Sequence, residues 1–179
     1  MNETRILVVD TNIRLKEIGM EDAEVIFNTI NNEREYLGEW LPFVEHTQEI
    51  AYTRGYIESY LDSNQTDLTC AIYYQNRFAG LIGLKDTDRD NKRVEIGYWL
   101  SEAFQHKGIV TSACKTLINY AFDEMDMHRV QIKAATGNIK SQRIPERLGF
   151  TREGIERDGE LHARGFVDLV TFSLLKTDR

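Results

Sequence analysis

The chain has 179 residues, of which 41% are hydrophobic, a length that suits one well-buried core and is short for two. Its 29 acidic residues outnumber the 22 basic ones, and the net charge of −7 argues against broad binding to nucleic acid or to an anionic membrane, since both need a basic face. The sequence has no signal-peptide pattern, and no apolar run approaches the ~18 residues of a membrane span, so we expect a cytoplasmic protein. We expect a single domain over residues 1–179.

Cysteines and histidines give no indication of a metal site. Cys70 and Cys114 lie far apart in apolar patterns, which is typical of buried thiols in a reducing compartment. The histidines show no metal-ligand spacing; they are His46, His106, His128 and His162. We therefore expect neither a disulfide nor a bound metal.

The N-terminal part of the chain combines strand and helix patterns. In chain order, we expect strands at 5–9 and 13–17, a helix at 20–30, an aromatic-rich short helix and loop at 36–43, and a helix from 47 to about 60. Thr47 is a suitable N-cap for the last of these helices. The expected buried stripe of that helix includes Ile50, Ile57 and Leu61.

The rest of the chain begins with a β-meander and ends on a long strand. The expected elements are strands at 67–74, 78–85 and 93–100, a helix that starts at about 110, a strand at 129–136, a short helix at 141–148 and a strand at 166–176. Short polar connections between the first three strands indicate antiparallel pairing. This order predicts an α+β fold with a mostly antiparallel sheet and inserted helices.

A glycine-containing loop lies between the 93–100 strand and the helix that follows it. Gly108 lets the backbone approach a ligand closely, and the open amides of a helix N-terminus bind anions such as a pyrophosphate. The G-x-x-x-x-G-K-[ST] pattern of nucleoside triphosphate sites is missing. An ordinary glycine turn is the alternative explanation. The candidate cofactor-binding residues in the loop are Gln105, His106, Lys107, Gly108, Ile109, Val110 and Thr111.

Four segments, in this order and spacing, resemble the GNAT superfamily of acetyl-coenzyme A-dependent N-acetyltransferases, and within it the ribosomal-protein (Rim-type) branch. The segments are 95–100, 105–111, 138–150 and 168–175. The resemblance implies a twisted, mostly antiparallel central sheet flanked by helices. It also implies acetyl-coenzyme A as the co-substrate and a primary amine as the acceptor, with the α-amino group of a ribosomal protein as the first choice.

The resemblance assigns candidate roles in catalysis. Glu160, in a polar loop expected at 158–162, would be the general base that removes a proton from the amine, and Glu95 is the rival for that role. Ser141 would be the acid that protonates the departing thiolate, although a helix N-cap explains the same serine. Many family members have a tyrosine as this acid, and here its position is taken by Pro145.

The resemblance also implies contacts with the two substrates. Trp99 and Leu100 would offer backbone groups to the pantetheine chain, and Asn138 would bond the same chain. Val110 stands where the family usually has glycine or alanine, which narrows the phosphate site but leaves the amide available. The expected substrate-side residues are Leu37, Trp40 and Leu41.

Two other functions remain open on the same fold. One is acetylation of a small amine such as a polyamine, an amino acid or an aminoglycoside. The other is a coenzyme A-binding module without turnover, against which the presence of both Glu160 and Ser141 argues. The branch commonly self-associates, so the partners left open include a second copy of the chain.

Overall fold

The computed structural model of the chain describes residues 4–63 and 66–179. Within these residues eight strands form one sheet, in the order β1-β2-β3-β4-β5-β6-β8-β7. All neighbouring strands are antiparallel except β5 and β6, which are parallel. The strands are β1 (Ile6–Val8), β2 (Ile13–Glu17), β3 (Leu68–Tyr74), β4 (Arg77–Asp88), β5 (Arg93–Leu100), β6 (Arg129–Ala135), β7 (Thr151–His162) and β8 (Gly165–Leu175).

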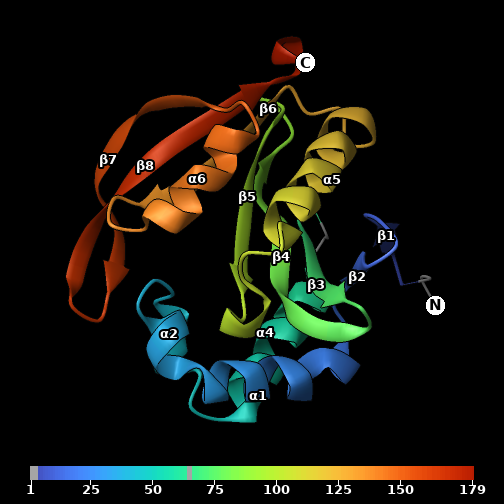
Figure 1. Cartoon of the computed structure of the whole chain (residues 1–179), viewed down its shortest axis with the longest axis vertical. Coiled ribbons are helices and arrows are strands. Elements are labelled where there is room, and N and C mark those ends of the chain that lie inside the picture. Colours follow the sequence, from blue (N-terminus) through green and yellow to red (C-terminus); the bar gives the residue numbers. More distant parts are fainter. Residues whose placement is uncertain (1–3, 64–65) are drawn as a thin grey trace.

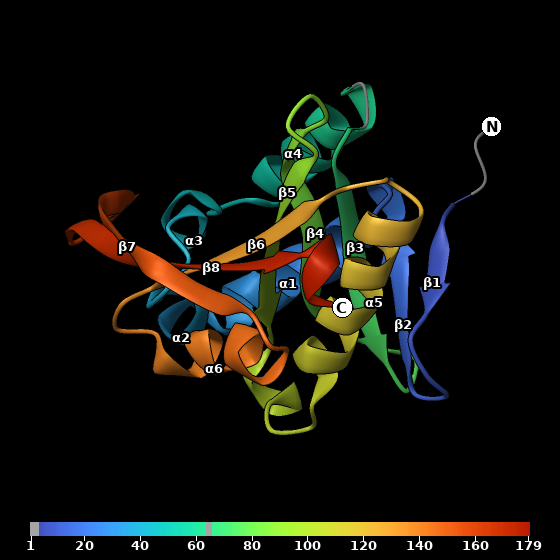
Figure 2. The same ribbon diagram turned by 90° about the horizontal axis from the view of Figure 1, so that it is seen from above.

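Helices cover both faces of the sheet (Figures 1 and 2). One face carries α5 (Ile109–Asp123) and α6 (Ile139–Arg147). The other carries the N-terminal helices α1 (Ala23–Asn32), α2 (Arg34–Gly38), α3 (Phe43–His46) and α4 (Ile50–Asp62). Short 3₁₀ turns complete the fold at Met20–Asp22, Glu102–Phe104 and Lys176–Asp178. Among the described residues, no helix combines the length and apolar character needed to cross a membrane.

The alternation along the strands produces two hydrophobic clusters, one on each face of the sheet. Val94 and Ile96 of β5 pack with the apolar side of α5, whereas Trp99 packs with residues of α1 and α4. Because side chains alternate between the faces of a strand, β5 contributes to both clusters. Both faces of β5 are therefore buried over most of its length, which holds the strand in a fixed position beside the loop that follows it.

The structure corrects three expectations from the sequence, which concern a loop, a helix cap and a buried residue. Residues 151–162 form strand β7, whereas a polar loop was expected over 158–162. The N-cap of α4 is Glu49, and the Thr47 hydroxyl bonds the Phe43 carbonyl oxygen at the end of α3 instead. Leu61 is exposed, because the buried side of α4 is formed by Thr53, Ile57 and Tyr60.

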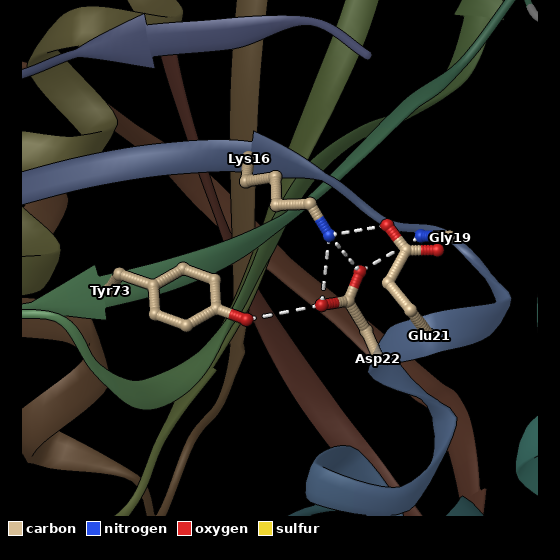
Figure 3. A network of polar contacts seen from close by, with 5 residues as sticks. All are labelled: Lys16, Gly19, Glu21, Asp22 and Tyr73. Atoms are coloured by element: carbon tan, nitrogen blue, oxygen red, sulfur yellow. Dashed lines mark hydrogen bonds and ion pairs between the residues drawn. The ribbon is translucent and has the colours of Figure 1, made fainter.

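A buried polar network joins the first helix to the sheet (Figure 3). The Asp22 carboxylate accepts bonds from Lys16 Nζ at 2.8 Å, from the Gly19 amide at 2.9 Å and from Tyr73 Oη at 3.0 Å. Burial by itself would lower the pKa of Lys16, but its bonds to Asp22 and Glu21 outweigh this and raise the pKa. Asp22 thus connects β2, the start of α1 and β3.

We expect Asp22→Ala to lower the free energy of unfolding by about 3–5 kcal/mol, because it leaves a partly buried Lys16 ammonium without its main partner. Glu21→Gln is the matched control, since the Glu21 side chain is 63% exposed and its ion pair with the same lysine should contribute less than about 1 kcal/mol. Urea denaturation monitored by circular dichroism measures both. Equal losses in the two variants would contradict the central role of Asp22.

Candidate active site

The parallel pair β5 and β6 separates to form an opening in the sheet. The two strands pair only at Arg93 with Arg129, Val94 with Val130 and Glu95 with Gln131. Beyond these residues β5 continues to Leu100 and β6 to Ala135, and among the described residues no further pairing joins the two strands. Two adjoining cavities lie along this opening, and together they contain most of the residues singled out from the sequence.

The first cavity has a volume of about 660 Å³ and follows the end of β5, the glycine loop and the start of α6. All the expected cofactor-binding residues line it: Trp99, Leu100, Gln105, His106, Lys107, Gly108, Ile109, Val110, Thr111 and Asn138. Gly108 is the N-cap of α5 and has a left-handed backbone, with φ of 72°. His106 is left-handed too, with φ of 61°. Such a turn before a helix directs successive amides toward a bound anion.

The electrostatics of this cavity suit a phosphate-rich ligand. Four cationic side chains line it, against the two carboxylates of Glu39 and Glu102, although the whole chain is acidic: Lys107, Lys140, Arg143 and Arg147. Lys140 of α6 also bonds Gln105 at 3.4 Å, and the Gln105 amide contacts the Tyr36 hydroxyl, so the loop is held from both sides. Backbone amides and nearby cations together fit the pyrophosphate and the further phosphate of coenzyme A.

The second cavity has a volume of about 990 Å³ and extends toward α4 and β7. Six residues border both cavities and mark their junction: Trp40, Leu41, Tyr98, Trp99, Asn138 and Ser141. A ligand that enters along the first cavity therefore presents its end to the second. This arrangement suits a reaction between a long carrier molecule and a separate acceptor.

The expected substrate-side residues do not all reach the second cavity. Trp40 and Leu41 border both cavities, whereas Leu37 is buried in the core and borders only the first. The Trp40 ring lies so close to Gly137 that a Cβ added there would come within 3.1 Å of Cη2. Trp40 therefore covers the turn before α6, directly at the junction.

Ser141 lies at the junction, but it is not the cap of α6. The N-cap is Asn138, whose Oδ1 accepts the Ser141 amide at 3.1 Å. The Ser141 hydroxyl is left for another partner and donates to Tyr98 Oη at 3.1 Å, while Tyr98 Oη donates to the Ser141 carbonyl oxygen. The helix expected at 141–148 begins two residues earlier, at Ile139, and the alternative that Ser141 is its N-cap is wrong, because Asn138 takes that position and asparagine serves equally well as an N-cap.

Tyr98 is a site residue that the sequence did not single out. The alternation of β5 places it on the same face as Val94 and Ile96, so it looked like a core residue. Burial raises the pKa of Tyr98, and its hydroxyl therefore stays protonated at physiological pH. The one available signal for a role in the site was the polar hydroxyl of Tyr98 on a strand face that is otherwise aliphatic, directly before Trp99.

Ser141→Ala should lower kcat by ~10-fold or more with little change in the KM for acetyl-coenzyme A, if the serine protonates the thiolate. Because Asn138 caps α6, the variant should keep the wild-type melting temperature, whereas Asn138→Ala should lose about 1 kcal/mol of stability. Steady-state kinetics and thermal unfolding measure the two effects. A fully active alanine variant would remove Ser141 from the chemistry.

Glu160 lies on β7 and borders the second cavity. The pairing of β7 with β8 is irregular between Glu156 and Glu160, and Asp158 has a left-handed backbone with φ of 51°. The Asp158 amide donates to the Asp168 carboxylate at 2.8 Å, so Asp168 fixes this bulge. The bulge in turn sets the direction of β7 at Glu160, and with it the direction of the Glu160 side chain.

Glu95 also borders the second cavity, but its carboxylate is already paired. Oε1 lies 2.8 Å from Lys85 Nζ, and Oε2 accepts a bond from Gln131 at 3.0 Å. Burial alone would lower the pKa of Lys85, but Glu95 and its neighbours raise it, so the lysine stays charged. A carboxylate that is already paired with a lysine is a poor proton acceptor, which leaves Glu160 as the better candidate base.

A sheet that opens between two parallel strands, with an anion-binding loop in the opening and a junction of two cavities beside it, defines an acyl-coenzyme A-dependent acetyltransferase. Residues 12–151 match the family described as "Acetyltransferase (GNAT) domain", and the chain belongs to this family. It is an acetyl-coenzyme A-dependent N-acetyltransferase.

Similar proteins agree with this placement. YdaF of Bacillus subtilis (strain 168), provisionally named a ribosomal N-acetyltransferase, is 39% identical over 176 residues, which cover 95% of this chain and 94% of YdaF. The solved structure of the microcin self-immunity acetyltransferase MccE with acetyl-CoA and AMP is 30% identical, with a TM-score of 0.89 and coverage of 93% and 94%. The solved structure of the ribosomal-protein acetyltransferase RimL with coenzyme A has a TM-score of 0.92 and covers 98% of this chain and 100% of the RimL chain. Its sequence identity is 22%, so this similarity shows the fold alone.

Proposed function

We propose that this enzyme acetylates the α-amino group of a protein N-terminus in the cytoplasm, with ribosomal proteins as the first acceptors to test. The observation that carries the choice of acceptor is the charge pattern of the second cavity. Four carboxylates line it, together with two lysines: Asp67, Asp86, Glu95 and Glu160. Lys85 pairs with Glu95 and lies 3.8 Å from Asp86, and Lys133 pairs with Glu156 at 2.7 Å. Because two of these carboxylates face a lysine, the cavity offers a polyamine less negative charge than its acidic residues alone suggest.

The rim of the second cavity also favours a peptide. Three aromatic side chains there are exposed to solvent by 40% to 58%: Phe43, Tyr52 and Tyr56. Exposed aromatic side chains at a cavity offer apolar contact area of the kind found in protein recognition sites. The side chains and backbone that follow an N-terminal amine can use this area, whereas a small amine such as an amino acid is too short to reach it.

Each proposed step has a residue suited to it. The loop amides and Asn138 hold the coenzyme, so that its thioester lies at the junction of the cavities. Glu160 takes a proton from the incoming ammonium and leaves a neutral amine that attacks the acetyl carbonyl carbon. Ser141, held by Tyr98, gives a proton to the sulfur as the C–S bond breaks and regains one from the nitrogen that has bonded to the acetyl carbon. The products are the acetylated amine and free coenzyme A, and Glu160 releases its proton to solvent.

Transfer is direct in this proposal, without an acetylated enzyme. Both cysteines are buried, and burial raises the pKa of Cys70 to about 12. Burial raises the pKa of the Cys114 thiol as well. A thiol with a raised pKa holds almost no nucleophilic thiolate at neutral pH, so neither cysteine is suited to carry the acetyl group.

The test is mass spectrometry of ribosomal proteins after incubation with the enzyme and isotopically labelled acetyl-coenzyme A. We expect label on the α-amino group of one or a few proteins, and synthetic peptides with the same N-termini should release coenzyme A at comparable rates. Spermidine, free amino acids and an aminoglycoside form the comparison panel. Faster turnover with any of these than with every peptide would overturn the proposal.

A further inference from the structure

Glu160 has a close partner that the reaction described above does not use. His162 Nε2 lies 2.7 Å from Glu160 Oε2, and the two residues share one face of β7 because they are two positions apart. The His162 side chain is only 9% exposed, whereas that of Glu160 is 42% exposed. A nearly buried imidazole thus holds one oxygen of a carboxylate that borders the second cavity.

We propose that His162 is a positioning residue for acetyl transfer, which holds Glu160 Oε2 so that the other carboxylate oxygen is presented to the amine. The inference rests on the proposed role of Glu160 as the base. Within the described residues Glu160 Oε1 has no hydrogen-bond partner, so it is the oxygen available to accept the proton. The bulge fixed by Asp168 places the backbone of Glu160, and His162 fixes its side chain.

The contact depends on the protonation of His162. A neutral imidazole with its proton on Nε2 donates to Oε2 and orients the carboxylate without a charge. A protonated imidazole forms an ion pair instead and makes the carboxylate a weaker base. We therefore infer that protonation of His162 weakens Glu160 as a base and so lowers turnover.

Other charged groups border the same cavity and must be separated from this effect. Asp67 comes from the residue before β3, Lys85 and Asp86 from β4, Glu95 from β5, Lys133 from β6 and His46 from α3. Glu160 contributes to the raised pKa of Lys85, so the two side chains interact electrostatically. Lys85 and Lys133 are each paired with a glutamate, which leaves His46 as the lining residue of a type that changes charge between about pH 5 and 8. His162 does not line the cavity itself and contacts Glu160, which does.

The experiment compares kcat across pH for His162→Gln and His162→Leu, with saturating peptide and acetyl-coenzyme A. Glutamine keeps a donor but does not titrate, so its turnover should stay within ~3-fold of wild type near pH 8 and fall less than wild type toward pH 6. Leucine removes the donor and should lower kcat by ~10-fold near pH 8, with the KM for acetyl-coenzyme A unchanged. His128→Gln is the control, since His128 is exposed and borders neither cavity.

A double variant separates this inference from the proposed base. If His162 acts through Glu160, His162→Leu should cost nothing further in a Glu160→Gln background. Full activity of Glu160→Gln alone would overturn the role of Glu160 as the base. A large loss in Glu160→Gln with wild-type activity in His162→Leu would overturn only the role of His162. If the leucine variant fails to fold, the pH profile of His162→Gln decides, and a wild-type profile there contradicts the inference.

Discussion

Glu160→Gln should lower kcat by ~10²-fold or more near neutral pH, because the amide has the size of the carboxylate but cannot accept a proton. Part of the loss should return at high pH. A peptide α-amine has an ordinary pKa of about 7.7–8.0, so above about pH 9 most of the acceptor is already neutral and needs no base. The rate of coenzyme A release, measured from about pH 6 to 9.5, reports both effects.

Two controls make the result specific to Glu160. The affinity for acetyl-coenzyme A should not change, since Glu160 borders only the second cavity. Glu146→Gln removes the same charge from an exposed position on α6 that borders neither cavity, and it should leave turnover unaltered. A wild-type pH profile for Glu160→Gln would remove Glu160 from the mechanism and make Glu95, despite its ion pair, the base to test next.

Gly108→Glu should weaken coenzyme A binding by about 100-fold or more. The new carboxylate would stand beside the amides that hold the pyrophosphate, and a repulsion of about 2.7 kcal/mol is reached by like charges a few ångströms apart in a partly screened site. The glutamate side chain has room, since nothing lies within 4 Å of a Cβ at this position. Titration calorimetry with coenzyme A measures the loss.

The strain of a left-handed side chain can be tested separately. Gly149 has φ of 79°, also with no atom within 4 Å of an added Cβ, and it borders neither cavity. Gly149→Glu therefore carries the same backbone cost of about 1–2 kcal/mol and the same charge, but it should bind coenzyme A normally. Lys107→Ala should reduce the affinity only modestly. Normal binding by Gly108→Glu would show that the coenzyme phosphates lie elsewhere.

Strong periodic patterns made most of the fold predictable. β2 was expected at 13–17 and lies at Ile13–Glu17, and the expected strand at 93–100 is β5. The helical spacing after Gly108 predicted α5, because its apolar stripe packs on one face of the sheet. Chain order placed the loop between β5 and α5, and this order brought the residues from Trp99 to Thr111 into one cavity, which Asn138 joins from the turn before α6.

The parts that could not be predicted lack such a pattern. β7 is an edge strand with most of its residues exposed, so it carries no apolar alternation, and its bulge at Asp158 interrupts the register. The contact of Tyr98 with Ser141 joins residues that are 43 positions apart and depends on the cap of α6. Pairings of this kind follow from tertiary packing, which local sequence does not encode.

The separation of β5 from β6 also bears on how this sheet avoids aggregation. An unpaired strand edge is a template on which another chain can add a strand. The open stretches of β5 and β6 carry such edges, but they lie in the interior of the sheet, since each strand is paired along its other side with β4 or β8. A strand from another molecule can approach the outer edges at β1 and β7 directly, whereas these inner edges lie between two halves of one sheet. The unpaired backbone groups of the opening are thus accessible to a narrow ligand but not to a strand of another protein.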